Sequence, residues 1–111
     1  MKYVLLICDD ETASPTNEEL EVDPVHRAWA ADLERRGAKR GGLRLRPVVD
    51  ATTVRVRDGE TLVSDGPFAE TKDFVGGVLI LECEDLDEAI AIAAGHPYAQ
   101  WGGVEIRPVW E

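Results

Sequence analysis

The sequence predicts one α+β domain over residues 1–111, and three observations predict it. Two nearly continuous apolar runs, residues 2–8 and 75–83, have the composition of strands covered on both faces. Each run is followed further along the chain by an amphipathic helical pattern. A turn-forming Asp58-Gly59 pair separates two short alternating runs and predicts a hairpin. The resulting order is that of a ferredoxin-like βαββαβ fold with an extra β-hairpin, an antiparallel sheet and helices on one face.

The first helix has clear start and stop signals. Asp23 can cap it, and Pro24 fits the first helical position because that N–H needs no partner. Gly37 fits the stop. The predicted buried stripe recurs every four residues, at Val25, Trp29 and Leu33. A polar loop over residues 9–23, with a helical turn at 17–21, joins this helix to the first strand.

The middle of the chain predicts β-structure. Residues 43–50 alternate and indicate a strand with Leu43 and Leu45 on one face. Pro47 predicts a bulge or a sheet edge there. The hairpin covers residues 52–63, and the sequence leaves open whether it joins the main sheet or forms an arm that reaches a partner.

The second helix follows the second apolar strand. Asp85 and Glu88 fit a capping box, and Gly95 and Pro97 mark the end. Its predicted buried face comprises Leu86, Ala89, Ile90 and Ala93. Residues 103–109 form the last predicted strand, with Val104 and Ile106 on one face.

The two apolar strands also predict a second contact surface. Helices cover only one face of the expected sheet, so the other face needs a cover. A symmetric second copy is the simplest cover, which predicts a homodimer. In this topology the strands run antiparallel, so Cys8 and Cys83 lie at opposite ends and stay unbonded, reduced and buried. Neither cysteine has metal-ligand spacing, so we expect no metal and no cofactor.

Charge excludes several partner classes. Twelve basic and 22 acidic residues give a net charge of −10. An acidic surface repels nucleic acids and anionic lipids. No apolar run approaches the about 18 residues of a membrane span, and the start turns acidic at Asp9 without a cleavage site. We therefore expect a cytoplasmic protein with neither a nucleic-acid nor a membrane partner.

Basic residues are concentrated in one segment. Residues 35–57 carry a net charge of +7, which leaves −17 for the remainder. This segment indicates either a site for an anionic ligand, with Arg44 and Arg55 as candidates, or arginines that pair with acids on the surface. A small-molecule ligand is the partner that the first alternative implies.

His26 is the first candidate for chemistry. It lies about 55° from the centre of the buried stripe, at 100° per residue, where a side chain can reach a cleft between helix and sheet. A histidine held by a carboxylate is the arrangement that a general base needs near neutral pH. The alternative is a structural histidine bonded to a backbone carbonyl. Phosphate-loop and serine-nucleophile motifs are absent from the sequence.

A wider pattern resembles a known family. Residues 65–73, DGPFAETKD, resemble the signature loop of the DGPF-motif branch of the YCII-related family. The resemblance extends to MKYVLLI, TVRVRDGETLVSDGPFAETK, GGVLILE, DLDEAIAIA and VEIRPV. It implies a dimeric α+β barrel, and members are proposed to be enzymes because a first-helix histidine lies near an aspartate. Members of this branch are often encoded beside extracytoplasmic-function sigma factors.

The resemblance assigns candidate residues by position. His26 matches the first-helix histidine, Asp9 is the first candidate for its aspartate partner, and Asp65 is the second. The alternative for Asp65 is structural: an aspartate before Gly66-Pro67 commonly accepts hydrogen bonds from backbone N–H groups of the turn. Phe68 is expected to anchor the loop and to border a ligand. The wider family often has an acidic residue at the position of His96. Because this chain has a histidine there, we do not expect a carboxylate to act at this position.

Three functional hypotheses follow. The first is a small-molecule enzyme in which His26 moves a proton and Asp9 or Asp65 orients it, while Arg44, Arg55 and Phe68 bind the ligand. The second is a non-catalytic ligand-binding or regulatory module, linked to a sigma factor. The third is a stable dimer whose His26 is structural. A cavity that contains both His26 and a carboxylate would favour the first hypothesis, an open patch with an exposed His26 the second, and a filled core around His26 the third.

Overall fold

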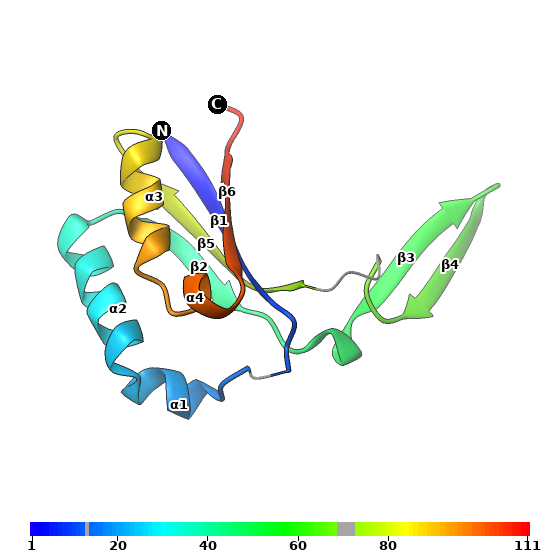
Figure 1. The fold of residues 1–111 in the computed structure, drawn as a ribbon. Coiled ribbons are helices and arrows are strands. Elements are labelled where there is room, and N and C mark those ends of the chain that lie inside the picture. Colours follow the sequence, from blue (N-terminus) through cyan, green and yellow to red (C-terminus); the bar gives the residue numbers. More distant parts are fainter. Residues whose placement is uncertain (13, 69–72) are drawn as a thin grey trace.

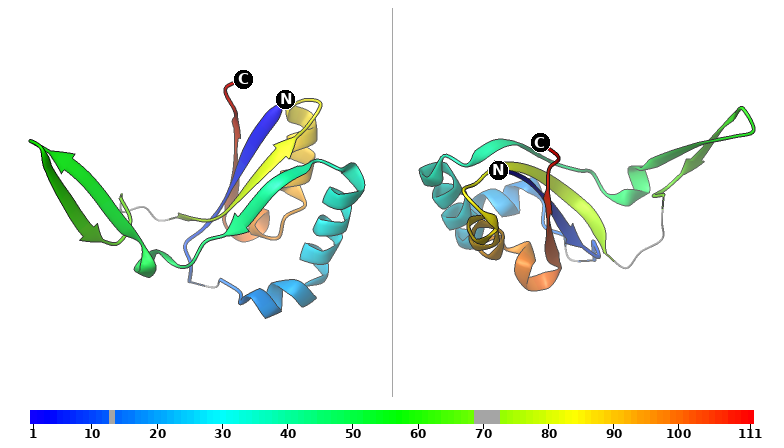
Figure 2. Two further views of the ribbon diagram at one scale, coloured as in Figure 1. Left: turned by 180° about the vertical axis from the view of Figure 1, so that it is seen from behind. Right: turned by 90° about the horizontal axis from the view of Figure 1, so that it is seen from above.

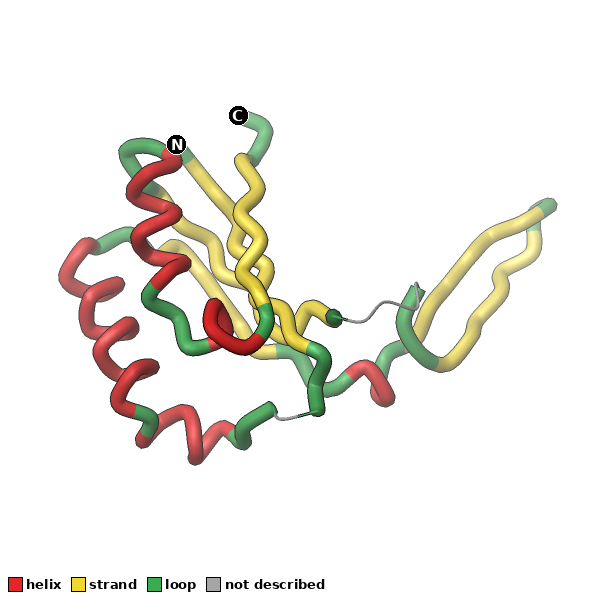
Figure 3. Tube along the Cα trace, in the orientation of Figure 1, coloured by secondary structure: helices red, strands yellow, loops and turns green. Residues whose placement is uncertain are grey.

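The computed structural model describes residues 1–12, 14–68 and 73–111 (Figures 1 and 3). Its main sheet has four antiparallel strands in the order β2-β5-β1-β6. These strands are β1 (Lys2–Asp9), β2 (Lys39–Arg44), β5 (Phe74–Glu82) and β6 (Gly103–Pro108). The α-helices are α1 (Asn17–Val22), α2 (Pro24–Arg36), α3 (Leu86–Ala94) and α4 (Tyr98–Trp101). This strand order confirms the predicted ferredoxin-like α+β fold.

The core lies between the main sheet and helices α2 and α3, which cover the same face (Figure 2). Leu5 of β1, Leu81 of β5 and Ile92 of α3 each expose less than 2% of their surface. Leu33 of α2 packs into the same cluster. Burying one such side chain stabilises the fold by about 1.5–3 kcal/mol. This cluster fixes α2 against the sheet and thereby positions the residues of its first turns.

The predicted helix signals are confirmed locally. Asp23 caps α2, and Gly37 ends it in the left-handed region with φ of 63°. Asp85 caps α3 by accepting a hydrogen bond from the Glu88 backbone N–H at 2.9 Å. In the predicted capping box the Glu88 carboxylate would accept from the backbone N–H of Asp85. It accepts instead from the backbone N–H of the preceding residue, Glu84, at 3.0 Å.

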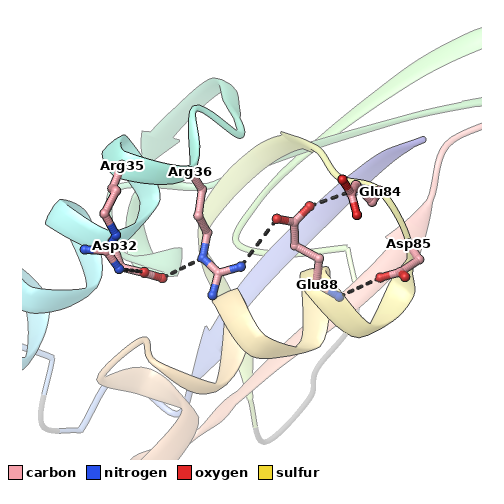
Figure 4. A network of polar contacts seen from close by, with 6 residues as sticks. All are labelled: Asp32, Arg35, Arg36, Glu84, Asp85 and Glu88. Atoms are coloured by element: carbon pink, nitrogen blue, oxygen red, sulfur yellow. Dashed lines mark hydrogen bonds and ion pairs between the residues drawn. The ribbon is translucent and has the colours of Figure 1, made fainter.

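An ion-pair network joins the ends of α2 and α3 (Figure 4). The Arg36 guanidinium donates to Asp32 at 2.8 Å and to Glu88 at 3.4 Å. Asp32 also accepts from Arg35. These groups are partly exposed, so the network contributes little stability beyond the core. Its effect is to hold the C-terminal end of α2 beside the first turn of α3.

The predicted strand over residues 43–50 is wrong in its bounds. β2 ends at Arg44, and Val48–Asp50 forms the 3-10 helix η1. The chain leaves the sheet after Leu45, whose N–H bonds the Gly76 carbonyl at 2.8 Å, and Pro47 has no N–H to continue the ladder. Leu43 and Leu45 are therefore on an uncovered edge, with 62% and 42% of their surface exposed.

Two predicted buried faces need correction. Val25 is 45% exposed because it lies in the first turn of α2, whereas Leu33 further along that helix reaches the core. Leu86 and Ile90 are each 48% exposed. The buried face of α3 is centred instead on Ala89, Ile92 and Ala93, which a rotation of 100° per residue places together.

Within residues 1–12, 14–68 and 73–111, no helix covers one face that β1 and β5 share. The pairs Val4↔Ile80 and Leu6↔Val78 alternate with the buried residues of β1 and β5, so their side chains point away from α2 and α3. We call these four residues the open face. Ile80 is 38% exposed and the other three residues are half-buried, so this face is a surface that a second copy can cover, and the homodimer stays a prediction.

The hairpin forms a separate two-stranded sheet of β3 (Thr52–Arg57) and β4 (Glu60–Asp65). We call residues Thr52–Asp65 the arm, because Figures 1 and 2 show them projecting away from the main sheet and its helices. The predicted turn is confirmed, since Asp58 and Gly59 both have positive φ. The radius of gyration, 15.8 Å, exceeds the about 13 Å typical of a compact chain of this length.

Candidate functional site

A cavity of about 220 Å³ lies between the helices and the covered face of the main sheet. We call it the His26 cavity. Its walls come from α1, α2, β1, β2, β5 and the segment around α4. Its polar and aromatic lining residues are His26, Trp29, Lys39, Arg44, His96 and Tyr98. Segments far apart in the sequence therefore meet at one site.

The start of α2 positions His26. The Asp23 carboxylate accepts from the backbone N–H groups of Val25 and His26, at 2.8 and 3.2 Å, and fixes the first turn. The His26 side chain is half-buried and faces the cavity. Its ring lies 5.5 Å from the Trp29 ring and 5.9 Å from the His96 ring, measured between centroids. The border position that the sequence predicts for His26 is thus where the structure places it.

His96 is held as a neutral hydrogen-bond donor. Its side chain is buried, and its Nδ1 accepts from the Tyr98 backbone N–H at 3.1 Å. With Nδ1 as acceptor, the proton of the neutral ring resides on Nε2. Burial, with a smaller contribution from the charge of His26, lowers the pKa of His96 to about 4. At neutral pH the ring therefore stays uncharged and offers one N–H.

Trp29 anchors the aromatic wall of the cavity. Its indole N–H donates to the Ile92 carbonyl of α3 at 2.9 Å. Its ring meets the His96 ring edge to face at 4.7 Å, and His96 contacts Tyr98 in the same manner at 5.4 Å. Edge-to-face contacts of this kind restrict ring rotation. Trp29 thus packs against the hydrophobic core, as predicted, and its ring also contacts both histidines.

Arg44 closes the cavity at the end of β2. Its guanidinium donates to the Asn17 side chain at 2.6 Å, to the Pro15 carbonyl and to the Tyr98 hydroxyl at 3.4 Å. Lys39 adds a second cation from the same strand. No aspartate or glutamate occurs among the described residues that line this cavity. In a chain of net charge −10, this local excess of positive charge favours an anionic ligand.

Asp9 lies in a neighbouring cavity of about 310 Å³. We call it the Asp9 cavity. Arg44, Gly76 and Tyr98 line both cavities and so form their common boundary. The buried Asp9 carboxylate accepts from the Glu11 N–H at 3.2 Å and from the Ser14 hydroxyl at 2.8 Å. Within the part of the chain that the structure describes, no hydrogen bond joins Asp9 to His26.

The other three candidates lie outside both cavities. Asp65 ends β4 on the arm and pairs with Thr52. The Arg55 guanidinium stacks over the Phe68 ring at 4.9 Å and donates to the Phe68 carbonyl at 3.4 Å. Phe68 is 71% exposed, so it does not pack its loop onto the main sheet as an anchor would. Glu70 and Lys72 of the DGPFAETKD segment, for which the sequence favours surface charges over the polar edge of a pocket, lie outside the described residues.

Sequence reasoning did not assign His96 and Tyr98 to the site. The resemblance marks this neighbourhood only through His96, which replaces an acidic residue common in the wider family. The available signal was local: His96-Pro97-Tyr98 directly follows the end of α3 at Gly95, where the chain must turn back toward the sheet. His96 belongs to the site because it is buried with its ring 5.9 Å from that of His26. A short sequence motif does not indicate whether a side chain is buried.

Neither metal binding nor a membrane span is suggested by the described residues. Among them, no group of three histidine, cysteine or acidic side chains could hold a metal ion. None of the helices in residues 1–12, 14–68 and 73–111 is long and apolar enough to cross a membrane. Cys8 and Cys83 are free, and burial is the first cause of the raised pKa of each thiol. Cys8 is half-buried rather than fully buried, because it lies near the end of β1.

The fold and the cavity together define a class: a small ferredoxin-like α+β protein with a histidine-lined cavity between sheet and helices. The chain belongs to the family described as the YCII-related domain, whose model matches residues 1–111. It is 36% identical over 115 residues to an uncharacterized protein of Rhizobium meliloti (strain 1021), covering 98% of this chain and 92% of that protein.

One solved structure that is similar in shape is a 5-chloro-2-hydroxyhydroquinone dehydrochlorinase (TftG) from Burkholderia phenoliruptrix AC1100, in complex with 2,5-dihydroxybenzoquinone. The match has a TM-score of 0.49 and 19% sequence identity, and it covers 100% of this chain and 94% of that chain.

Proposed function

We propose that the protein is a small-molecule enzyme that binds an anionic substrate in the His26 cavity and moves a proton with His26. One observation supports this most strongly: a single small cavity gathers His26, the neutral His96 and Arg44, with no carboxylate among its described lining residues. Histidine is the side chain whose ordinary pKa suits proton transfer near neutral pH. The proposed chemistry therefore uses His26 as base and the other groups as donors.

The reaction class that fits these groups is proton transfer at a carbon next to a carbonyl. His26 takes the proton, the electron pair of the broken C–H bond forms a C=C bond, and the π pair of the carbonyl moves onto its oxygen. The protonated His26 then gives the proton to that oxygen, which completes a keto–enol isomerisation, whereas return of a solvent-derived proton to the carbon gives exchange. His96 Nε2–H can stabilise the oxygen as it becomes negative, since a fixed donor in a water-poor site is most effective there. The described lining residues include neither serine nor cysteine, so acyl transfer to such a nucleophile has no support.

Arg44 is the proposed binding group for a second anionic function on the substrate. Asp9 is proposed as a positioning residue that acts through the loop before α1. It holds Ser14 and Glu11, and the same loop receives the Arg44 guanidinium at Pro15 and Asn17. Asp65, Arg55 and Phe68 lie on or next to the arm, so they can serve a cavity of this kind only in a second copy.

Anion binding is tested with benzoate as a probe and benzyl alcohol as its uncharged match. We expect benzoate to shift the amide resonances of Trp29, His96 and Tyr98 in ¹⁵N NMR spectra, and benzyl alcohol to shift them less. Arg44→Gln should raise the benzoate Kd by about tenfold or more, because a charge-assisted hydrogen bond contributes about 1.5–3 kcal/mol. The control Arg46→Gln loses the same charge but borders only the Asp9 cavity.

Catalysis is tested by solvent deuterium exchange into a series of small 2-oxo acids, followed by proton NMR. The wild-type protein should speed exchange at the carbon next to the carbonyl, and His26→Ala should lose about a hundredfold of that acceleration or more. Arg27→Ala, an exposed neighbour on the same helix, should keep it. Benzoate binding that depends on Arg44 without any exchange would instead support the ligand-binding module.

We also propose a homodimer in which a second copy covers the open face. The support is the paired apolar strip of Val4, Leu6, Val78 and Ile80, which no helix among the described residues covers. Leu43, 62% exposed on the neighbouring edge strand, extends this strip. Sedimentation velocity from about 1 to 100 μM protein tests this dimer: we expect a dimer for the wild type and a monomer for Ile80→Lys. A wild-type protein that is monomeric at 100 μM would contradict it.

A further inference from the structure

Two adjacent glycines, Gly76 and Gly77, lie within β5 and line the His26 cavity. Glycine inside a strand weakens it, and it commonly marks a bulge or a place where another group approaches the backbone closely. Two consecutive residues of β1 pair with Gly77 and Val75, so Gly76 is the extra residue of a bulge. Gly77 is in register with both neighbouring strands, so the bulge does not explain it.

Gly77 lies on the face of the main sheet that the helices cover. It is buried, and the core residues Leu79 and Leu81 follow it on the same face of β5. A Cβ built on Gly77 would have as its nearest neighbours the Leu43 carbonyl oxygen at 3.5 Å and the Ile7 side chain at 3.7 Å. Both are ordinary van der Waals distances, and both neighbours belong to the adjacent strands. The space above Gly77 therefore belongs to the cavity rather than to a packed helix.

Gly42 of β2 provides a contrast in the same cavity. A Cβ built on it would lie 2.8 Å from Cδ1 of Leu79, so this buried leucine already fills the space that the glycine leaves. The sheet side of the cavity thus contains one glycine that a core side chain covers and one whose backbone is left bare. The bare backbone at Gly77 is where a ligand can lie directly on the sheet.

The residues around Gly77 indicate the chemistry of such a ligand. Arg44 is its partner on β2, so the two residues lie on the same face with Cα atoms about 5 Å apart. A cation therefore stands beside the bare backbone. The helix side of the cavity supplies the rings of Trp29 and His96. Aromatic walls of this kind favour another ring, which they can meet face to edge.

The volume of the cavity limits the size of the ligand. An apolar cavity of about 150 Å³ in another protein holds benzene. The His26 cavity has about 220 Å³, so it has room for a single ring with a short acidic chain. A bulkier residue at Gly77 would take up part of that room at the sheet.

We propose that Gly77 determines the specificity of the His26 cavity by receiving the ring of an aromatic 2-oxo acid whose carboxylate binds Arg44. The inference rests on the proposed function and adds to it the class of substrate. The ring lies against the sheet at Gly77, and the acidic end lies beside the partner residue on β2. Gly77 is in this view a specificity-determining residue, whereas His26 remains the group that moves the proton.

The test compares benzoate with acetate, which has the same carboxylate and no ring, by ¹⁵N NMR titration of the full chain. We expect the wild type to bind benzoate at least about tenfold more tightly than acetate, because the ring is buried. Gly77→Ala should raise the benzoate Kd by about tenfold or more and the acetate Kd far less, since the added methyl group overlaps the ring alone. The matched control Gly41→Ala adds a methyl group to the opposite face of the sheet, 3.8 Å from Cδ1 of Ile80, and should leave both Kd values unchanged.

The outcomes separate this inference from the proposed function. If Gly77→Ala binds benzoate as the wild type does, or weakens both anions equally, the ring site is overturned. Anion binding in the cavity then still stands if Arg44→Gln weakens both anions. A wild-type protein that binds neither anion overturns both proposals.

The reaction provides a second readout, through deuterium exchange into phenylpyruvate and pyruvate. Gly77→Ala should reduce the acceleration of exchange at least about tenfold more for phenylpyruvate than for pyruvate. Equal losses for the two acids overturn the inference, because the effect would then not depend on the ring. The expected difference in benzoate and acetate binding, with no exchange into either acid, supports the ring site and overturns the proposed proton transfer.

Discussion

The main sheet and the arm are both antiparallel β-structure, yet only one of them is covered. In the main sheet, Leu5 and Leu81 are nearly inaccessible to solvent because α2 and α3 form a second layer. In the arm, no residue of Thr52–Asp65 is buried. Both segments have the residues that favour strands. The difference shows that local sequence is enough to form a strand pair, whereas the second layer decides whether the pair is stable by itself.

This difference also divides the candidate functional residues. His26, Arg44 and Asp9 are held by hydrogen bonds and packing inside one chain, so their geometry is set before any partner binds. Asp65 and Arg55 belong to the arm, which projects away from the main sheet and its helices. Preorganised chemistry is therefore expected in the main sheet and its helices rather than in the arm.

The largest expected effect contrasts a leucine in each region. Leu81→Ala should lower the free energy of unfolding by about 2–5 kcal/mol, because it leaves a cavity in a fully buried position. Leu62→Ala, on the polar face of the arm and 45% exposed, should change it by less than about 0.5 kcal/mol. Urea denaturation at one protein concentration measures both. Comparable losses would show that the arm is as well packed as the sheet.

A second prediction concerns His96 and pH. Its pKa is about 4 in the folded protein, below the about 6.5 of an exposed histidine, so the unfolded state binds a proton first as pH falls. Stability contributed by the neutral ring is therefore present above about pH 6.5 and is lost between that pH and about 4. Solvent near the cavity screens the group, so we expect a loss of about 2 kcal/mol.

The control for this effect is His96→Asn, because other titrating groups remain in both proteins. Urea denaturation at intervals from pH 7.5 to 4 should give a stability difference between wild type and variant that shrinks as pH falls. A difference that is constant across this range would mean that His96 is not held neutral in the folded state.

The elements that could be predicted from the sequence are those with local causes. Asp23-Pro24, Gly37 and the Asp58-Gly59 turn each act through their own backbone, so their positions were correct. The start of β2 was missed because Lys39–Arg44 contains two glycines and three cations and looks like a loop. It becomes a strand because the edge of β5 offers partners from Leu81 to Gly77.

The candidate site was predictable only in part for the same reason. The helical angle of His26 is a local property, and it correctly indicated a side chain facing a cavity. The neutrality of His96 arises from burial between elements, and the sequence does not show burial. Whether Asp9 would reach His26 depended on the path of the loop after β1. That loop instead uses the Asp9 carboxylate to bond Glu11 and Ser14.

The smallest predicted effect uses the same substitution in the two regions. Gly37 at the end of α2 and Gly59 in the arm turn have φ of 63° and 79°, and no atom lies within 4 Å of where a Cβ would be added at either. Alanine at each therefore meets only backbone strain, of about 1 kcal/mol. Gly37→Ala should lower the free energy of global unfolding by that amount, because the cap belongs to a helix that packs in the core.

Gly59→Ala should leave the free energy of global unfolding at 1 μM protein within about 0.3 kcal/mol of wild type. Amide exchange of Arg55 and Leu62, a hydrogen-bonded pair of the hairpin, should become about fivefold faster, as expected for a strain confined to a locally unfolding segment. If the arm packs on a second copy, the same variant should become more destabilising as the protein concentration rises, because dimerisation then couples the arm to global unfolding. Gly37→Ala supplies the control, since its effect should not depend on concentration. Equal global losses for the two alanine variants at 1 μM would mean that the arm unfolds together with the main sheet in a single chain.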